Sequence, residues 1–176
     1  MKKMLNLVLS LTLIAGVCAA ILAYVNQMTK GPIQEVTARL RTEAVKRVMP
    51  SGVETVEVSG EQFVGKNAAG QIVGYAAEGL DEQGYGGPIR LMVGFEADRR
   101  TVVVYQKLEA SETPGLGAKL TTDEFSAQFV GKDARALKVK KDGGDIEAIT
   151  GATITSRAVC RAIAAAQAKL TEDVAK

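Results

Sequence analysis

Ile89-Arg90-Leu91-Met92-Val93-Gly94-Phe95 carries the clearest structural signal in the chain. Large apolar residues alternate there with Arg90, Met92 and Gly94, so the stretch predicts a β-strand with one buried face. Further short β-like runs, separated by glycine-rich or charged turns, are Thr55–Val58, Gln71–Ala76, Thr101–Tyr105 and Leu137–Lys140. The Asp98-Arg99-Arg100 stretch between two runs predicts a hairpin turn.

Three helices are expected from the sequence in addition to these strands. Ser156–Leu170 places apolar residues on one face of an alanine-rich helix suited to packing on a sheet, and Thr121–Phe129 predicts a shorter helix. An amphipathic helix is expected from Pro32 to Met49, after a break at Gly31-Pro32. The sequence therefore predicts an α+β fold: one domain over residues 31–176, with packed helices and a sheet rich in antiparallel pairs.

The run Met4–Val25 contains no charged residue. At about 1.5 Å per helical residue it can cross the roughly 30 Å of a hydrocarbon core, which predicts a transmembrane anchor over residues 1–30. Lys2 and Lys3 precede the run, so we expect a single-pass protein of the bacterial inner membrane, with its N-terminus cytoplasmic and residues 31–176 extracytoplasmic. A cleaved signal peptide is the alternative. The apolar run continues past Cys18-Ala19-Ala20, which favours a retained anchor.

Composition excludes several function classes. The chain has 22 basic and 20 acidic residues, with no histidine, and the part after Lys30 is close to neutral. Nucleic-acid binding is disfavoured, because it depends on clustered basic residues. Without histidine, Ser-His and Cys-His catalysis and the usual catalytic zinc sites are unavailable. We expect no metal site and no catalytic residue, so any chemistry belongs to a cofactor or to the remaining side chains.

Three stretches rich in glycine or hydroxyl residues are candidates for ligand binding. Thr150-Gly151-Ala152-Thr153-Ile154-Thr155-Ser156 precedes the last helix, where exposed N–H groups favour a phosphate. On physical grounds alone, however, Thr153 or Thr155 as a simple N-cap is the commoner arrangement. The other two stretches, Glu112–Lys119 and Gly84–Pro88, most simply form surface turns, although Tyr85 could stack on a planar ring.

The order of these segments resembles the FMN-binding domain family, and closely the G subunits of Rnf electron-transport complexes. In that family a flavin transferase joins the phosphate of FMN to the last threonine of a Ser/Thr-Gly-Ala-Thr element, which here is Thr153. The resemblance implies that Thr150, Gly151, Ala152 and Thr155 surround the phosphate. It further implies that a loop lies along the isoalloxazine ring, formed by Glu112, Thr113, Pro114, Gly115, Leu116 and Gly117.

The function implied by the resemblance is that of a membrane-anchored electron carrier with covalent FMN. The complex would move electrons between ferredoxin and NAD and couple this flow to sodium-ion or proton translocation. Its other membrane and peripheral subunits would be partners, with the transferase acting in maturation, and the chain alone would have no independent catalysis. The alternatives are the C subunit of the sodium-translocating NADH:quinone reductase, a flavin reductase with an external acceptor, and a membrane-tethered assembly module without flavin.

Two positions depart from the family pattern. Glu147 stands where the transferase recognition pattern usually has Asp, and Glu109-Ala110-Ser111 stands where relatives often have a histidine. Lys119 could favour a reduced flavin by charge, although a solvated lysine is the commoner case. Cys160 is expected to be a small buried hydrophobe.

Overall fold

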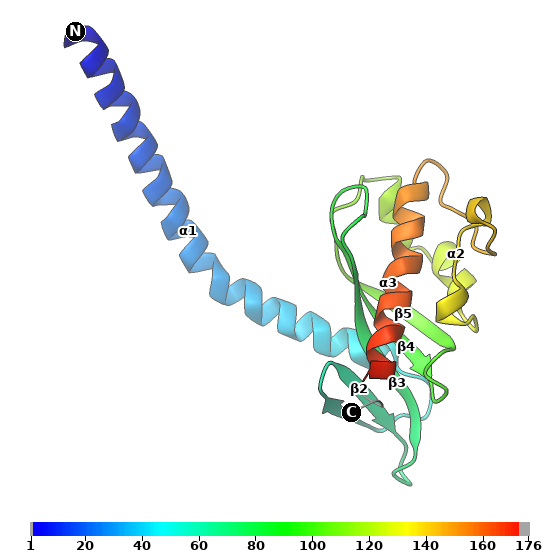
Figure 1. Cartoon of the computed structure of the whole chain (residues 1–176). Coiled ribbons are helices and arrows are strands. Elements are labelled where there is room, and N and C mark those ends of the chain that lie inside the picture. The colour runs from blue at the N-terminus through cyan, green and yellow to red at the C-terminus, as the bar shows by residue number, and fades with distance from the viewer. Residues whose placement is uncertain (1, 173–176) are drawn as a thin grey trace. The chain divides into compact units, whose positions relative to one another are not determined.

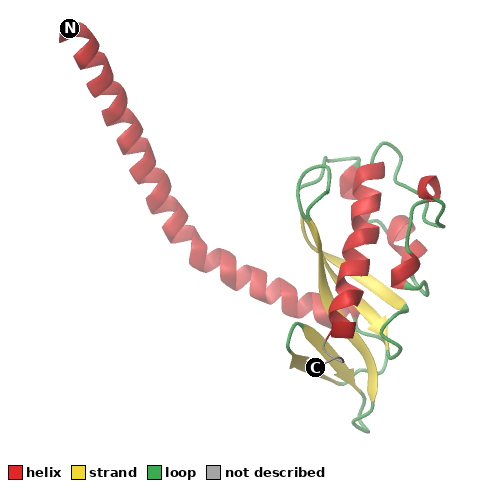
Figure 2. Cartoon of the chain, viewed as in Figure 1, coloured by secondary structure: helices red, strands yellow, loops and turns green. Residues whose placement is uncertain are grey.

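The computed structural model describes residues 2–172 (Figures 1 and 2). Residue 1 of the expected anchor and residues 173–176 of the expected domain lie outside the described part. Its helices and strands are α1 (Lys2–Val48), β1 (Thr55–Ser59), β2 (Gln62–Lys66), β3 (Ile72–Asp81), β4 (Ile89–Glu96), β5 (Val102–Ala110), α2 (Asp123–Ser126) and α3 (Thr153–Glu172). Short 3-10 turns are η1 (Gly117–Thr121), η2 (Ala127–Phe129), η3 (Ala134–Ala136) and η4 (Lys140–Asp142). The predicted α+β class with an N-terminal apolar helix is confirmed.

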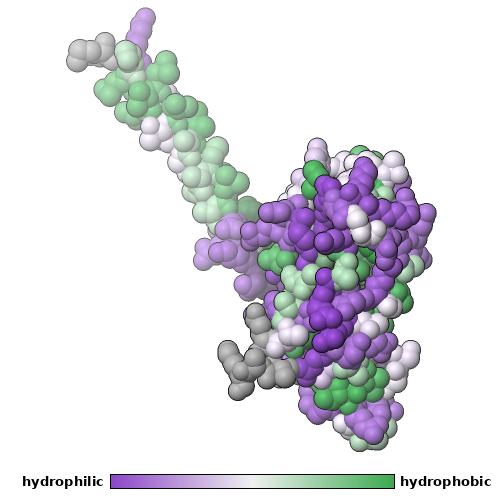
Figure 3. All heavy atoms as spheres, turned by 45° about the vertical axis from the view of Figure 1, so that its right-hand side comes forward, coloured by the Kyte–Doolittle hydropathy of each residue, from purple (hydrophilic) through white to green (hydrophobic). Residues whose placement is uncertain are grey.

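Contacts divide the chain into two compact units at Leu40/Arg41. The first unit is helical, and its apolar side chains are exposed, as the hydrophobic colouring of the N-terminal helix in Figure 3 shows. By length and composition, α1 could cross a membrane. The expected boundary after residue 30 concerns the membrane and stays a prediction.

The predicted break at Gly31-Pro32 is wrong, because Pro32 lies inside the continuous helix α1. A proline removes one backbone hydrogen bond, and its ring crowds the preceding turn. The residue before it is Gly31, which has no Cβ to meet the proline ring, and helix-forming residues follow. The chain therefore continues as one helix through this position.

The five strands form one antiparallel sheet in the order β1-β2-β3-β4-β5. The sequence predicted four of these strands and missed β2, which is short and contains Gly65. The strand predicted over Leu137–Lys140 is wrong: Val139 makes only an isolated parallel bridge to Ile146, between the turns η3 and η4. The helix predicted over Thr121–Phe129 is formed in part, as α2 followed by η2.

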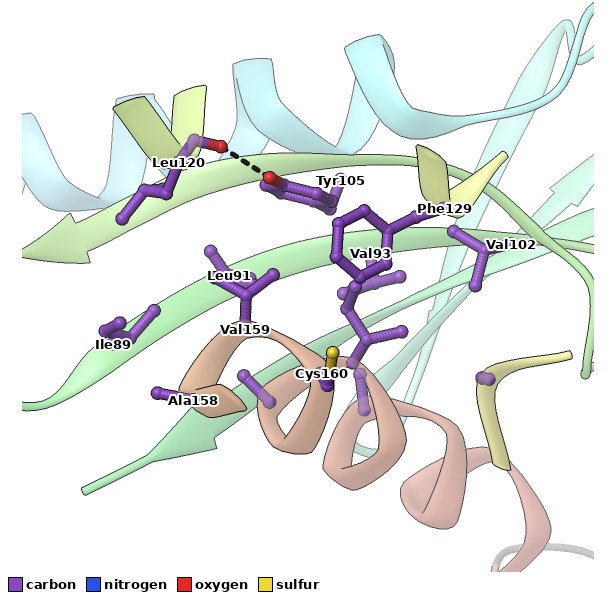
Figure 4. Close-up of a cluster of buried hydrophobic side chains, with 14 of the residues drawn as sticks. Ile89, Leu91, Val93, Val102, Tyr105, Leu120, Phe129, Ala158, Val159 and Cys160 are labelled. Atoms are coloured by element: carbon purple, nitrogen blue, oxygen red, sulfur yellow. Dashed lines mark hydrogen bonds between the residues drawn. The ribbon is translucent and has the colours of Figure 1, made fainter. Parts of the chain in front are cut away.

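Helix α3 packs on one face of the sheet. Gly79 of β3 allows the close approach, because a Cβ there would lie 1.9 Å from the carbonyl oxygen of Ala162. Figure 4 shows Leu91 and Val93 of β4 facing Val159 and Cys160 of α3. This face, with η1, α2 and η2 beside it, holds the main hydrophobic core.

Tyr105 and Cys160 are titratable groups inside this core. The Tyr105 hydroxyl donates a hydrogen bond to the carbonyl oxygen of Leu120, and its ring meets Phe129 edge-on at 5.4 Å between centroids (Figure 4). Burial raises the pKa of Tyr105 well above its ordinary value and the pKa of the Cys160 thiol to about 12. Cys160 is thus the small buried residue that the sequence predicted.

The end of α1 packs on the opposite face of the sheet. Val48 lies against Gly94, where a Cβ would come within 1.7 Å of the Val48 carbonyl oxygen. Ala44, Val45, Val48, Ala76 and Met92 form a second, smaller buried cluster. The last two turns of α1 therefore belong to the folded domain.

We expect Gly94→Ala to destabilise the domain by about 2–3 kcal/mol, because the added methyl group meets the backbone of Val48, which cannot rotate away. Thermal unfolding of the full chain in detergent measures this effect. Gly16→Ala is the control, since nothing lies within 4 Å of its new Cβ and it replaces a helical glycine with a better helix former. Equal melting temperatures for the two variants would contradict the close packing at Gly94.

Asp81 and Arg161 link β3 to α3, and the pair should make stability dependent on pH. Arg161 donates two hydrogen bonds to the Asp81 carboxylate, at 2.6 and 2.8 Å, and these lower the pKa of Asp81 below 3.8. The pair therefore stabilises the fold above pH 3.8 and loses its effect as the pH falls through the lowered pKa.

We expect Asp81→Asn to cost about 1 kcal/mol at pH 7 and less at pH 3. Denaturant unfolding at the two pH values measures the difference. Glu82→Gln removes the charge of an exposed neighbour and should have a small effect at both. A cost for Asp81→Asn that stays the same at pH 3 would argue against the ion pair.

Candidate functional site

A cleft of about 450 Å³ lies at the end of the domain where α3 begins. Figure 2 shows the loop after β3 and the loop after β5 gathered at this end of α3. Together with η4 and the first residues of α3, these loops supply the lining, which consists of Tyr85, Glu112, Thr113, Leu116, Gly117, Lys141, Gly151, Ala152, Thr153, Ile154 and Thr155. The volume is in the range of ligand-binding clefts.

Thr153 is the first residue of α3. The Ser156 N–H donates to the Ala152 carbonyl at 3.0 Å, the first helical bond, so Ala152 occupies the N-cap position. The interpretation of Thr153 or Thr155 as a simple N-cap is therefore wrong. The first N–H groups of a helix have no intrahelical acceptor, and with the helix dipole they favour an anion at this end of α3.

A hydrogen-bonded turn presents Thr153 at the cleft. The Ala152 N–H donates to the Ile149 carbonyl at 2.9 Å, and Gly151 has a φ of 78°, a conformation that favours glycine. The buried Ser156 hydroxyl accepts from the Ile149 N–H at 2.9 Å and donates to the Ala152 carbonyl at 3.0 Å. Ser156 thus closes the turn, a role that its place in the hydroxyl-rich stretch did not reveal.

Glu112 joins three of the segments that form the site. Its Oε2 accepts a hydrogen bond from the buried Thr155 hydroxyl at 2.8 Å, and its Oε1 accepts one from the Gly86 N–H at 3.4 Å. Gly117 packs directly against this carboxylate, because a Cβ there would lie 2.4 Å from Oε2. One side chain therefore ties the loops after β3 and β5 to α3.

Most of the residues implied by the resemblance lie together. Those that line the cleft are Glu112, Thr113, Leu116, Gly117, Gly151, Ala152, Thr153 and Thr155. Pro114 and Gly115 are exposed in the same loop but are not among the lining residues. Thr150 lines a neighbouring cleft of about 250 Å³ together with Lys119 and Glu147, so Lys119 does not line the cleft that contains Thr153.

Three further residues line the cleft that contains Thr153. Tyr85 is 70% exposed, and Ile154 is 49% exposed, so both offer apolar surface at the rim. Lys141, in η4, brings a cation to the cleft from a loop that carries no motif. The sequence does not predict that Lys141 lies at the cleft, because this position depends on the tertiary fold of the loop before α3.

The loop that contains Lys141 is fixed to α3 by the next residue. Arg157 donates from Nε and Nη2 to the two carboxylate oxygens of Asp142, both at 2.7 Å, and these bonds lower the pKa of Asp142. Glu147, the departure from the family pattern, pairs with Lys140, and its backbone N–H donates to Gln128 at 2.7 Å. The carboxylate of Glu147 is therefore engaged by Lys140.

The donor set fits a phosphate joined to a planar group. Backbone N–H groups at the start of α3, the Thr153 hydroxyl and Lys141 can surround an anion, and Tyr85 and Leu116 offer surface for a ring. FMN combines these two features.

Comparisons with known proteins identify the same region. Residues 84–168 match the FMN-binding domain family. The chain is 33% identical to the G subunit of the ion-translocating oxidoreductase complex of Methanosarcina acetivorans, with 92% of each chain covered. It is also 33% identical to the G subunit of the Na⁺-translocating ferredoxin:NAD⁺ oxidoreductase complex of Acetobacterium woodii, covering 90% of this chain and 87% of that one.

A solved structure shares the fold. The crystal structure of Shewanella oneidensis NqrC superposes with a TM-score of 0.51 at 24% identity, covering 58% of this chain and 52% of that chain. The curated relatives match at higher identity and over nearly their whole length. From these matches and the cleft at the start of α3, the chain belongs to the family of FMN-binding G subunits of Rnf-type ion-translocating oxidoreductase complexes.

Proposed function

We propose that the chain is a membrane-anchored electron-carrier subunit of an ion-translocating ferredoxin:NAD oxidoreductase complex, with FMN joined through its phosphate to Thr153. The observation that carries the proposal is the position of Thr153: it is the first residue of α3 and it lines the cleft. A hydroxyl at a helix N-terminus lies where the backbone already stabilises a phosphate. The family relationship supplies the cofactor.

The residues of the chain bind and orient the flavin. Bound FMN would supply one- and two-electron chemistry, which the side chains present here do not offer. Gly151 and Ala152 leave room for the phosphate, and Leu116, 43% exposed, offers an apolar contact to the ring beside Tyr85. The network around Glu112 holds the loops in position, so that the ring has a fixed orientation.

The anchor fits a subunit that carries electrons but not ions. The stretch Met4–Val25 has no charged residue, whereas intramembrane ion pathways are built from ionisable side chains. Ion translocation, whether of sodium or of protons, therefore belongs to the other subunits of the complex. We place the N-terminus in the cytoplasm and the FMN domain outside it, where a covalent bond prevents the loss of a cofactor that could not readily be replaced.

Two alternative functions differ from our proposal in the complex or in the flavin content that they imply. A C subunit of the sodium-translocating NADH:quinone reductase would carry the same flavin in another complex, and the likeness to NqrC at 24% identity supports only a shared fold. A tethered assembly module would carry no flavin at all. Purification of the native complex and identification of its subunits separates the first from our proposal, and flavin analysis separates the second.

We expect Thr153→Val to abolish covalent flavin and to change stability by less than about 1 kcal/mol, because Ala152, not Thr153, occupies the N-cap position. The full chain is co-expressed with a flavin transferase, and the denatured protein is examined for in-gel flavin fluorescence and mapped by mass spectrometry. Thr121→Val is the control, since Thr121 is an exposed threonine of η1 outside the lining of the cleft.

Covalent flavin on the Thr153→Val chain would place the attachment site elsewhere. A wild-type chain without flavin, produced beside a substrate that the same transferase does modify, would favour the tethered assembly module.

We expect Glu112→Ala to lower stability by about 1–3 kcal/mol, because the buried Thr155 hydroxyl loses its acceptor. Attachment of flavin should also slow, since the loops are no longer joined to α3. Glu112→Gln keeps one oxygen acceptor in place and should have a smaller effect on both measurements. Thermal unfolding and the time course of flavin attachment test this, and a wild-type time course for Glu112→Ala would count against the linking role.

A further inference from the structure

Lys141 is a cation at the cleft that the sequence did not point to. It lies in η4 and lines the cleft together with Thr153 and the first turn of α3. Among the described residues of the lining, Glu112 and Lys141 carry charge. The carboxylate of Glu112 accepts hydrogen bonds from Thr155 and Gly86, so Lys141 is the positive group available to a ligand.

The backbone of η4 is held in one conformation. The Lys140 N–H donates to the Ile146 carbonyl at 2.8 Å, and the Asp142 N–H donates to the Val139 carbonyl at 2.8 Å. Gly143 ends the turn with a φ of 80°, in the left-handed region that favours glycine. Lys141 is thus presented from a closed turn.

The residues on either side of Lys141 are engaged elsewhere. Lys140 pairs with Glu147, and Asp142 makes the two-bond ion pair with Arg157. Arg157 lies one turn after Thr153 on the same side of α3, so the ion pair fixes the turn beside the first residue of the helix. The side chain of Lys141 is exposed and borders the cleft.

We infer that Lys141 binds the phosphate of the flavin at Thr153, and that Asp142 and Arg157 are positioning residues for it. The inference rests on the proposed function, because it assumes that an FMN phosphate lies at the start of α3. An ammonium group is well suited to this role: it is a point charge on a flexible stem and can follow the phosphate of free or attached FMN. The helix N-terminus and Lys141 would then both contribute to binding the anion.

The first test compares FMN with riboflavin, which has the same ring but no phosphate. Binding of each flavin to the unmodified full chain in detergent is measured by fluorescence quenching. Lys141→Ala should weaken FMN binding about three- to fivefold and leave riboflavin binding unchanged. Lys141→Arg should retain FMN binding, and Lys107→Ala, which removes an exposed lysine of β5 outside the lining of the cleft, should bind both flavins as the wild type does.

The same measurement tests the positioning pair. Asp142→Asn removes the charge that holds Arg157 and should weaken FMN binding by a smaller factor than Lys141→Ala, again without affecting riboflavin. The effect of Lys141→Ala should shrink as salt is added, because screening weakens an exposed charge pair. Unchanged FMN binding in Asp142→Asn would overturn the positioning role, and an equal loss of FMN and riboflavin in Lys141→Ala would overturn the phosphate assignment.

The second test uses chains that mass spectrometry shows to be loaded at Thr153. Attachment of flavin should raise the melting temperature of the wild type, Lys141→Arg and Lys107→Ala, and should raise it less in Lys141→Ala. An equal rise in Lys141→Ala and Lys107→Ala overturns the inference while the loaded wild type still supports the proposed function. A wild type that cannot be loaded, beside an active transferase, overturns both.

Discussion

The hydrogen bond from the Thr155 hydroxyl to the Glu112 carboxylate is the contact on which the geometry of the site depends. It joins the first turn of α3 to the loop after β5, and the other carboxylate oxygen reaches the loop after β3 through Gly86. Thr155 is fully buried, so its hydroxyl requires this partner. Three segments distant in the sequence are thereby brought to one cleft, and Gly117 is restricted to glycine by the same carboxylate.

The sheet provides the rigid base for this arrangement. Gly79 brings α3 into contact with β3, and Gly94 does the same for the end of α1 on the opposite face. At both glycines the helix backbone packs directly against the strand backbone, with no flexible side chain between them. The distance between α3 and the sheet is therefore fixed. The turn Ile149–Ala152 then needs only local hydrogen bonds to present Thr153.

The parts of the structure with a strong local pattern were predictable from the sequence. Alternation in β4 and the apolar face of Ser156–Leu170 indicated the α+β class. The helix begins three residues earlier than predicted, at Thr153, and β4 is buried on both faces and not on one, because the end of α1 covers Met92. The strand β2 was missed because its pairing with β1 and β3, not its own pattern, makes it a strand. Lys141 was missed for the same kind of reason: it lies at the cleft because of the tertiary fold of the loop before α3, which Asp142 joins to Arg157. The role of Ser156 in closing the turn likewise depends on how the backbone turns back, which brings the Ile149 N–H to its hydroxyl.

The burial of Cys160 has a consequence for the durability of a redox protein. Reactivity of cysteine toward peroxide and disulfides follows the fraction of thiolate, which is negligible at neutral pH for a group whose pKa is raised to about 12. Cys160 is the one cysteine after residue 30, and it lies on the helix whose first turn lines the cleft. Oxidants formed beside a flavin would therefore meet a Cys160 thiol that is buried and little ionised, so this residue of α3 is protected from sulfenic acid formation.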